Sequence, residues 1–162
     1  MSIRPAVPAD LPLIASLVRE LAEYEKLAHQ AVATEADFAA ALFGPSPKAH
    51  ALIVEHDGQP AGFAIYFYNF STFLGRPGIY VEDVFIRPEF RRGGFGRAIF
   101  KYLAQKAVAE NCGRMEWWVL DWNEPARGFY DKLGAIRMDE WTVHRLAGAE
   151  LAALAASRSS AS

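Results

Sequence analysis

The sequence predicts an α/β fold in which helices flank both faces of a mixed central sheet. Runs rich in β-branched and aromatic residues alternate with runs of helical periodicity, in the order β-α-α-β-β-β-α-β-α-β. Three successive strands are joined by short turns, which is typical of antiparallel neighbours. A strand, a loop, a helix and a further strand follow them, which is typical of a parallel pair. The 162 residues are the length of one domain, so we expect a single domain over 1–162.

The first half of the chain is expected to hold two helices and three strands. Apolar residues recur at helical spacing from Leu13 to Leu21 and predict a helix that ends near Tyr24. Thr34 followed by Asp37 resembles a capping arrangement and predicts a second helix to about residue 42. The expected strands are residues 2–6, 49–55 and 61–70, with a Gly-containing hairpin turn over 56–59 between the last two.

The second half begins with the strand around which the fold is organised, residues 78–87. A glycine cluster flanked by arginines then leads into a helix over 94–111. Asn123 is a plausible N-cap for a later helix, with Pro125 in its first turn. The remaining expected elements are strands over 115–120 and 138–146, a short helix over 149–156, and a frayed end at about 157–162.

Composition excludes several classes of protein. Lys and Arg number 17 against 19 Asp and Glu, a net charge of −2, whereas a nucleic-acid-binding domain is strongly basic. Cys112 is the only cysteine, so neither an internal disulfide nor a cysteine metal cage can form. The four histidines lack metal-ligand spacing, and we assign no metal site. The N-terminus lacks the apolar core of a signal peptide, and no apolar run could span a bilayer; we expect a cytoplasmic protein with no membrane partner.

The loop between the central strand and its helix has the composition of an anion site. Glycines at 93, 94 and 96 lie among Arg91, Arg92 and Arg97. Free backbone N–H groups and the positive end of the helix dipole point at such a loop. A P-loop is excluded because no Gly-Lys-Ser/Thr ends it, and a dinucleotide-binding loop would lie near the first strand. The alternative is a solvated turn that closes the connection from strand to helix.

Two carboxylates, Glu82 and Asp83, interrupt the apolar central strand. They are candidates for acid–base chemistry, because a carboxylate inside an apolar strand has a perturbed environment. A structural ion pair or an outward-facing edge position is the alternative. In a regular strand the two side chains lie on opposite faces, and only a bulge would put both near one site.

The order of elements, the Arg91-x-x-Gly94-x-Gly96 loop, the Glu82-Asp83 pair, and Asn123-Glu124-Pro125 followed by Phe129-Tyr130 together resemble the GNAT N-acetyltransferases. The resemblance spans nearly the whole chain. It extends to the diamine acetyltransferase branch, which holds the spermidine/spermine and thialysine N-acetyltransferases. It implies a GNAT fold, acetyl-CoA as cofactor with coenzyme A as product, and a homodimer.

The resemblance also implies a cofactor site. The segment Val84, Phe85 and Ile86 would hydrogen-bond the pantetheine as an extra strand. The diphosphate would be held by backbone amides of Arg91, Arg92, Gly93, Gly94, Phe95, Gly96 and Arg97. Asn123 and the following turn, including Ala126, would contact the other side of the cofactor.

For the reaction, a carboxylate must take a proton from the amine, because an alkyl ammonium has a pKa of about 10.4. Glu82 is the candidate base. The resemblance makes Tyr130 the candidate acid for the leaving thiolate, although a packed helix tyrosine is the alternative. The acceptor-binding residues that it implies are Tyr24, Glu25, Glu82 and Asp83, with Asp121 and Trp122 as second choices.

The acceptor is expected to be a small primary amine. The loop over 69–78 lacks the acidic residue and the tryptophan of the polyamine enzymes, which favours a lysine-like or thialysine-like amine or a diamine over spermidine or spermine. Attack should be direct, in a ternary complex, because Cys112 is poorly placed to carry an acetyl group. The other hypotheses are a non-catalytic acyl-CoA sensor and an enzyme that acetylates proteins.

Overall fold

The computed structural model describes residues 1–157, which divide into two compact units, Met1–Trp122 and the residues from Asn123 on. The strands are β1 (Ser2–Pro5), β2 (His50–His56), β3 (Gln59–Ser71), β4 (Arg76–Ile86) and β5 (Met115–Trp117). The helices of the first unit are α1 (Leu11–Tyr24), α2 (Glu35–Phe43) and α3 (Phe95–Ala109). Those of the second unit are α4 (Glu124–Lys132) and α5 (Gly148–Ala156).

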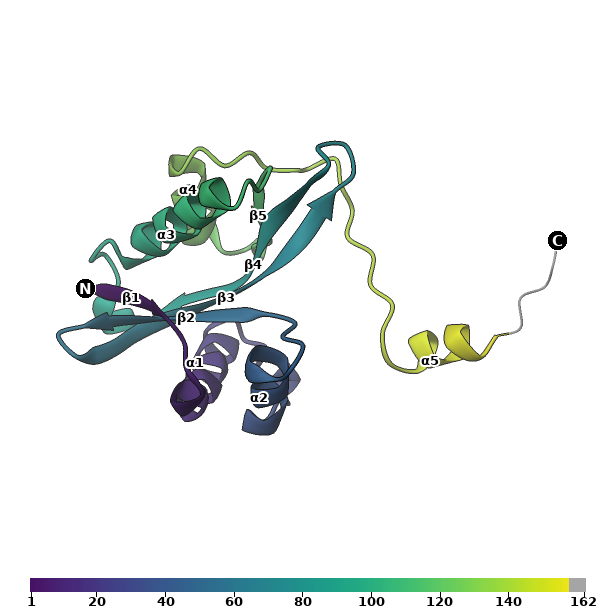
Figure 1. The fold of residues 1–162 in the computed structure, drawn as a ribbon, viewed down its shortest axis with the longest axis horizontal. Coiled ribbons are helices and arrows are strands. Elements are labelled where there is room, and N and C mark those ends of the chain that lie inside the picture. Colours follow the sequence, from purple (N-terminus) through teal and green to yellow (C-terminus); the bar gives the residue numbers. More distant parts are fainter. Residues whose placement is uncertain (158–162) are drawn as a thin grey trace. The chain divides into compact units, whose positions relative to one another are not determined.

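The strands form one sheet in the order β1-β2-β3-β4-β5 (Figure 1). Every neighbouring pair is antiparallel except β4 and β5, which are parallel. Short turns join β2 to β3 and β3 to β4, whereas α1 and α2 lie between β1 and β2 in the chain. In the β2–β3 turn Asp57 and Gly58 have the expected positive φ angles of 49° and 75°. The parallel pair needs a crossover, and α3 supplies it. The predicted mixed sheet is confirmed.

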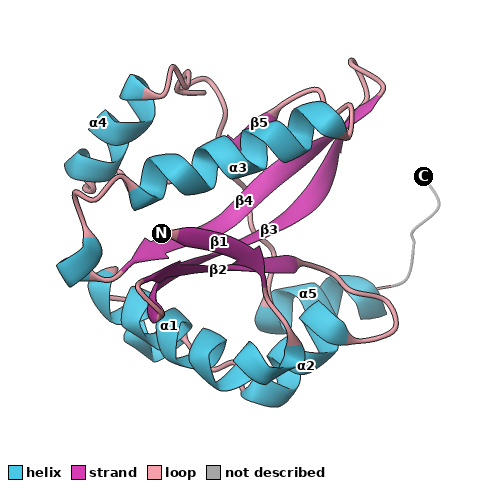
Figure 2. Ribbon diagram, turned by 60° about the vertical axis from the view of Figure 1, so that its left-hand side comes forward, coloured by secondary structure: helices cyan, strands magenta, loops and turns pink. Residues whose placement is uncertain are grey.

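Helices cover both faces of this sheet, as Figure 2 shows for α3 on one face and α1 and α2 on the other. On the α1 and α2 face, Ile14 and Leu17 pack with Phe63 and Phe85 of the sheet. On the α3 face, Ile99 and Leu103 of the helix are fully buried. Burial of these apolar faces is the main stabilising contribution to the fold.

A β-bulge interrupts β4 at Glu82. Ile65 of β3 pairs with Asp83, and the next residue, Tyr66, pairs with Val81, so Glu82 is the extra residue. Val81 and Asp83 therefore lie on opposite faces of the sheet, although a regular strand would put them on the same face. The sequence left open whether this strand is regular or bulged, and the structure has the bulge.

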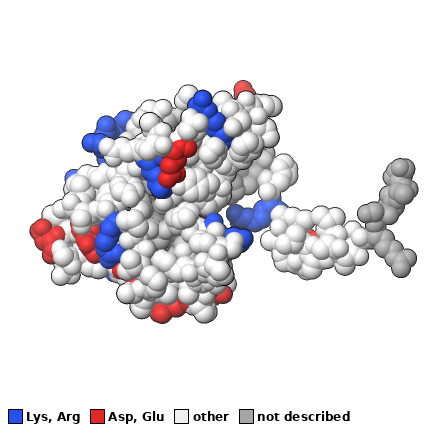
Figure 3. All heavy atoms as spheres, in the orientation of Figure 1, with Lys and Arg blue, Asp and Glu red and all other residues white. Residues whose placement is uncertain are grey.

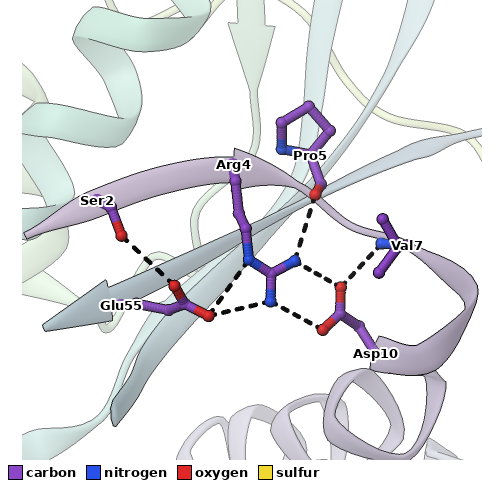
Figure 4. A network of polar contacts seen from close by, with 6 residues as sticks. All are labelled: Ser2, Arg4, Pro5, Val7, Asp10 and Glu55. Atoms are coloured by element: carbon purple, nitrogen blue, oxygen red, sulfur yellow. Dashed lines mark hydrogen bonds and ion pairs between the residues drawn. The ribbon is translucent and has the colours of Figure 1, made fainter. Parts of the chain in front are cut away.

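An ion-pair network fixes β1 to the rest of the first unit (Figure 4). The guanidinium of Arg4 donates to both carboxylate oxygens of Asp10, at 2.7 and 2.9 Å, and to Glu55 at 3.0 and 3.2 Å. Asp10 also accepts from the Val7 backbone N–H, and its pKa is lowered, chiefly by the hydrogen bonds from Arg4. The network ties the start of α1 to the edge of the sheet.

The predicted strand over 138–146 is wrong. The structure has a turn at residues 139–140, where the Trp141 N–H donates to the Met138 carbonyl, and irregular chain on both sides of it. Asp139 and Glu140 break the alternation of apolar residues at that point, so the local pattern was weaker than it looked. The strand predicted over 115–120 is confirmed only as far as Trp117. The helices predicted after Asn123 and near the C-terminus are confirmed.

The expected frayed end lies, from residue 158 on, outside the described residues. Within residues 1–157, no helix combines the length and the apolar character needed to cross a membrane. The face drawn in Figure 3 carries both acidic and basic side chains, and several of them lie side by side.

Candidate active site

The C-terminal end of α1 lies beside the bulged part of β4. The Tyr24 ring packs against the Phe85 ring, with centroids 6.4 Å apart, and against the Trp122 ring, also at 6.4 Å. Tyr24 and Trp122 remain partly open, at 38% and 50% exposed. Aromatic faces that are half open to solvent are suited to contact a cationic group.

Three carboxylates lie on the same two elements as Tyr24 and Phe85. Glu25 directly follows α1, and Glu82 and Asp83 are at the bulge of β4. Burial, and then the charges of Glu82 and Glu25, raise the pKa of Asp83 to about 7. Burial also raises the pKa of Glu25. The mutual repulsion shows that the carboxylates share one region, and such a region attracts a cation.

An ion pair sets the position of α1 against β4. The Arg87 guanidinium, just after β4, donates to the Glu20 carboxylate at 2.7 and 2.9 Å and to the Pro60 carbonyl at 3.1 Å. These hydrogen bonds from Arg87 lower the pKa of Glu20. The acidic end of α1 thus has two roles: Glu20 anchors the helix, and the charge of Glu25 helps to raise the pKa of Asp83.

Beyond the bulge, β4 presents one edge that no strand of the described chain pairs with. The β5 strand pairs with β4 only from Ile79 to Val81. The Arg87 N–H donates to the Ala61 carbonyl of β3. Counting back from Arg87, the backbone groups of successive residues point alternately to β3 and to the other edge of β4. Phe85 directs its N–H and C=O to β3, whereas Val84 and Ile86 direct theirs to the open edge. Of the three residues expected to pair with pantetheine, Val84 and Ile86 therefore have their backbone groups on that edge.

The glycine loop that follows has the geometry of an anion cradle. Arg92 and Gly94 have positive φ angles of 69° and 78°, which turn the chain into α3. At Gly93 a Cβ would collide with the Phe95 ring. The first N–H groups of α3, from Phe95 on, have no acceptor within the helix. Glycine at a tight approach, exposed arginines and a helix N-terminus fit a diphosphate.

Two cations of the chain lie over the Tyr24 and Trp122 rings, which the sequence did not indicate. The Arg91 guanidinium lies 4.4 Å from the Tyr24 ring centroid, and the Lys26 ammonium lies 5.4 Å from the Trp122 ring centroid. Arg91 Nε also donates to the Ile86 carbonyl at 3.0 Å. Sequence spacing carries no signal for such contacts, because they depend on the packing of α1 against β4.

The other predicted site residues lie as follows. Asp121 is exposed in the turn that precedes Trp122. In the second unit, Asn123 caps α4 as predicted, since its side-chain oxygen accepts from the Ala126 N–H at 3.3 Å. Tyr130 lies on α4 with its ring 5.4 Å from that of Phe129. No cluster of His, Cys, Asp and Glu in the described residues could hold a metal ion.

Comparison with known proteins identifies the family of the chain. A sequence profile of the acetyltransferase (GNAT) family matches residues 15–135. The chain belongs to the GNAT acetyltransferase family. It is 38% identical to a thialysine N-epsilon-acetyltransferase of Bos taurus, over 94% of this chain and 96% of the relative. It is 34% identical to an L-ornithine N5-acetyltransferase of Arabidopsis thaliana, over 94% of this chain and 86% of the relative.

The fold agrees with this membership. An integron cassette protein from V. cholerae superposes with a TM-score of 0.81 at 27% identity, covering 96% of this chain and 98% of that one. The resemblance to GNAT enzymes that the sequence indicated is confirmed, and the protein is an N-acetyltransferase. GNAT enzymes use acetyl-CoA as co-substrate.

Proposed function

We propose that this GNAT enzyme transfers the acetyl group of acetyl-CoA to the primary amine of a small lysine-like, ornithine-like or thialysine-like compound. The observation that carries the proposal is the cluster of Glu25, Glu82 and Asp83 beside the half-open rings of Tyr24 and Trp122. Carboxylates and aromatic faces together recognise an ammonium group. The relatives that act on thialysine and L-ornithine support an acceptor of this size.

The bulge carboxylates would prepare the amine for attack. The amine is bound as an ammonium and must lose a proton before its nitrogen can react. Glu82 was the candidate base from sequence. The structure adds Asp83, because a carboxylate whose pKa is raised to about 7 is a better proton acceptor at neutral pH than an ordinary one. In this proposal the proton leaves to the Glu82–Asp83 pair, directly or through water.

The residues of the chain fit a cofactor with a diphosphate and an amide-bearing arm. The loop from Arg91 to Arg97 would hold the diphosphate through its backbone N–H groups, and Val84 and Ile86 would pair with the arm along the open edge of β4. Bound there, acetyl-CoA supplies the acetyl group as a reactive thioester. From the resemblance, we also propose Asn123 and Ala126 as cofactor-binding residues.

Acetyl transfer then needs a proton for the thiolate that leaves. Tyr130 is the proposed donor, since a phenol in hydrogen-bond reach can protonate a thiolate. We infer that the amine attacks the thioester directly, within a ternary complex of enzyme, acetyl-CoA and amine. We also infer that the enzyme is a single domain. The family profile covers residues 15–135, across the boundary between the two units, which supports a single domain. A homodimer remains our expectation from the resemblance.

The test is release of the coenzyme A thiol from acetyl-CoA with a panel of amines: thialysine, lysine, ornithine, short diamines, spermidine, spermine and an aminoglycoside. Turnover confined to the small amines would support the proposal. Preferential turnover of spermidine or spermine would favour a polyamine enzyme. Tight acetyl-CoA binding without turnover of any amine would favour a sensor or a protein substrate and would contradict the proposal.

The panel is repeated with Asp83→Asn and with Glu89→Gln as the matched control. Glu89 is an exposed carboxylate in the turn after β4 and does not belong to the acceptor cluster. Asp83→Asn should lower kcat/KM by about 10² or more, because both ammonium binding and proton removal lose a carboxylate. Glu89→Gln should behave as the wild type.

A further inference from the structure

Arg91 belongs to the cofactor loop by position, yet its side chain reaches the acceptor site. Its Nε donates to the Ile86 carbonyl at 3.0 Å, on the open edge of β4. Its guanidinium lies over the Tyr24 ring at 4.4 Å and lies 5.7 Å from the Phe85 ring centroid. One side chain therefore contacts both a backbone acceptor of the cofactor edge and an aromatic face of the amine site.

Each of these contacts competes with one of the two substrates. A cationic amine that takes the Tyr24 face would meet the Arg91 guanidinium there, and two like charges on one ring repel. An amide-bearing arm that pairs with β4 would need the Ile86 carbonyl that Arg91 now occupies. Arg91 thus blocks part of each site in the position where the structure has it.

The two substrates have opposite charges, so they act oppositely on Arg91. A diphosphate in the adjacent loop attracts a guanidinium through charge-assisted hydrogen bonds. Arg91 that pairs with a diphosphate leaves the Ile86 carbonyl and the Tyr24 face. An ammonium offers Arg91 no new partner. An amine that binds without the cofactor must therefore displace Arg91 from the Ile86 carbonyl and the Tyr24 ring, and nothing replaces these two contacts.

We propose that Arg91 couples the two substrate sites, so that a cationic amine binds well only after Arg91 has moved from the Tyr24 ring to the cofactor diphosphate. The proposal rests on the proposed function, because it takes the substrates to be a coenzyme A thioester and an amine. It predicts that the cofactor binds first and the amine second. By linkage, the amine must strengthen cofactor binding by the same factor.

The neighbouring cations do not share this geometry. Arg92 on the loop and Arg97 in the first turn of α3 are exposed, and within residues 1–157 neither makes a hydrogen bond to the β4 edge or a cation–π contact with Tyr24. Lys26 lies over Trp122, the other ring of the site, and not on the cofactor edge. Arg97→Gln is therefore a matched control, since it removes one positive charge from the loop and leaves the contacts of Arg91 in place.

The test is calorimetric titration of the amine that the panel identifies, with and without saturating coenzyme A, which carries the diphosphate but cannot react. For the wild type, we expect coenzyme A to tighten amine binding by about tenfold. In Arg91→Gln the amine should bind without coenzyme A as well as it does with it. Arg97→Gln should bind coenzyme A more weakly but keep the full coupling factor. The reverse titration, of coenzyme A with and without the amine, must give the same factors.

Amine binding by the wild type that is equal with and without coenzyme A would overturn the coupling while leaving the acetyltransferase assignment intact. The same holds if Arg91→Gln keeps the wild-type factor. If no amine of the panel binds even with coenzyme A present, the proposed function fails and the coupling with it. Arg91→Met is a second variant should Arg91→Gln melt early, and the wild-type titration needs no variant at all.

Discussion

Asp83→Asn should make the protein more stable at alkaline pH, although it removes a charged group from a charged site. In the wild type the Asp83 pKa is raised from 3.8 to about 7, because burial and then the charges of Glu82 and Glu25 disfavour the ionised form. In the unfolded chain this carboxyl loses its proton near pH 3.8, whereas in the fold it keeps the proton up to about pH 7. The free energy of unfolding of the wild type therefore falls as pH rises from about 3.8 to about 7. The full shift corresponds to at most about 4 kcal/mol at pH 8, of which roughly three fifths falls between pH 5 and 8.

Solvent screening and sharing of charge among the three carboxylates reduce this figure, so we expect the free energy of unfolding of Asp83→Asn to gain about 1–2 kcal/mol on the wild type between pH 5 and pH 8. For a chain of this length that corresponds to roughly 2–8 °C in Tm. Thermal melts at pH 5, 6, 7 and 8 measure it. Glu82→Gln should show a smaller gain, because burial is the larger cause of the shift and only the second cause is removed.

Glu89→Gln, an exposed carboxylate, should show no gain with pH and serves as the control. A stability difference between Asp83→Asn and the wild type that stays flat from pH 5 to 8 would refute the reasoning. A variant that is less stable than the wild type at pH 8 would refute it too, because the ionised Asp83 carboxylate would then stabilise the fold by pairing with a neighbour.

Three further results are expected. Gly93→Ala should weaken coenzyme A binding, measured by calorimetry, and cost about 1–3 kcal/mol of stability, because its Cβ would displace the buried Phe95 ring; unchanged binding would show that the loop is not a close cradle. Glu20→Gln should raise KM for the amine more than it lowers kcat, because Arg87 loses the partner that fixes α1, and Glu20→Asp should restore part of it; equal effects of the two variants would contradict a positioning role. Tyr130→Phe should reduce turnover by about 10² or more while calorimetry shows coenzyme A still binding, whereas unchanged turnover would exclude Tyr130 as the acid.

Most of the fold could be predicted because its signals are local. Thr34 and Asp37 form the expected capping box, and Asp57-Gly58 adopts the expected hairpin turn. The strand expected over 138–146 failed for the same reason that the others succeeded: alternation is a local pattern, while a strand exists only where another strand accepts its hydrogen bonds. Met138 to Trp141 instead closes a turn on itself.

The site could be predicted as a set of residues but not as an arrangement. Glu82 and Asp83 stand out in the sequence as charges inside an apolar strand. Which of the two is the less exposed could not be read from the sequence, because it depends on where the bulge falls in the register with β3. The contact of Arg91 with Tyr24 joins residues 67 positions apart, and only the packing of α1 against β4 brings them together.

The single extra residue at Glu82 accounts for more of this site than any other feature of the fold. On one side of it, β4 pairs with both β3 and β5; on the other, β4 keeps only β3. The change of register gives Asp83 a half-buried position on the α1 face, and the end of the β5 pairing leaves the backbone groups of Val84 and Ile86 without a strand partner in the described chain. A carboxylate able to receive a proton and an edge able to bind an extended cofactor arm are thus produced within five residues of one strand. Deleting Glu82 should therefore impair amine binding and cofactor binding together, whereas Glu82→Gln, which keeps the bulge but removes one carboxylate of the cluster, should impair amine binding and proton removal and leave coenzyme A binding unchanged.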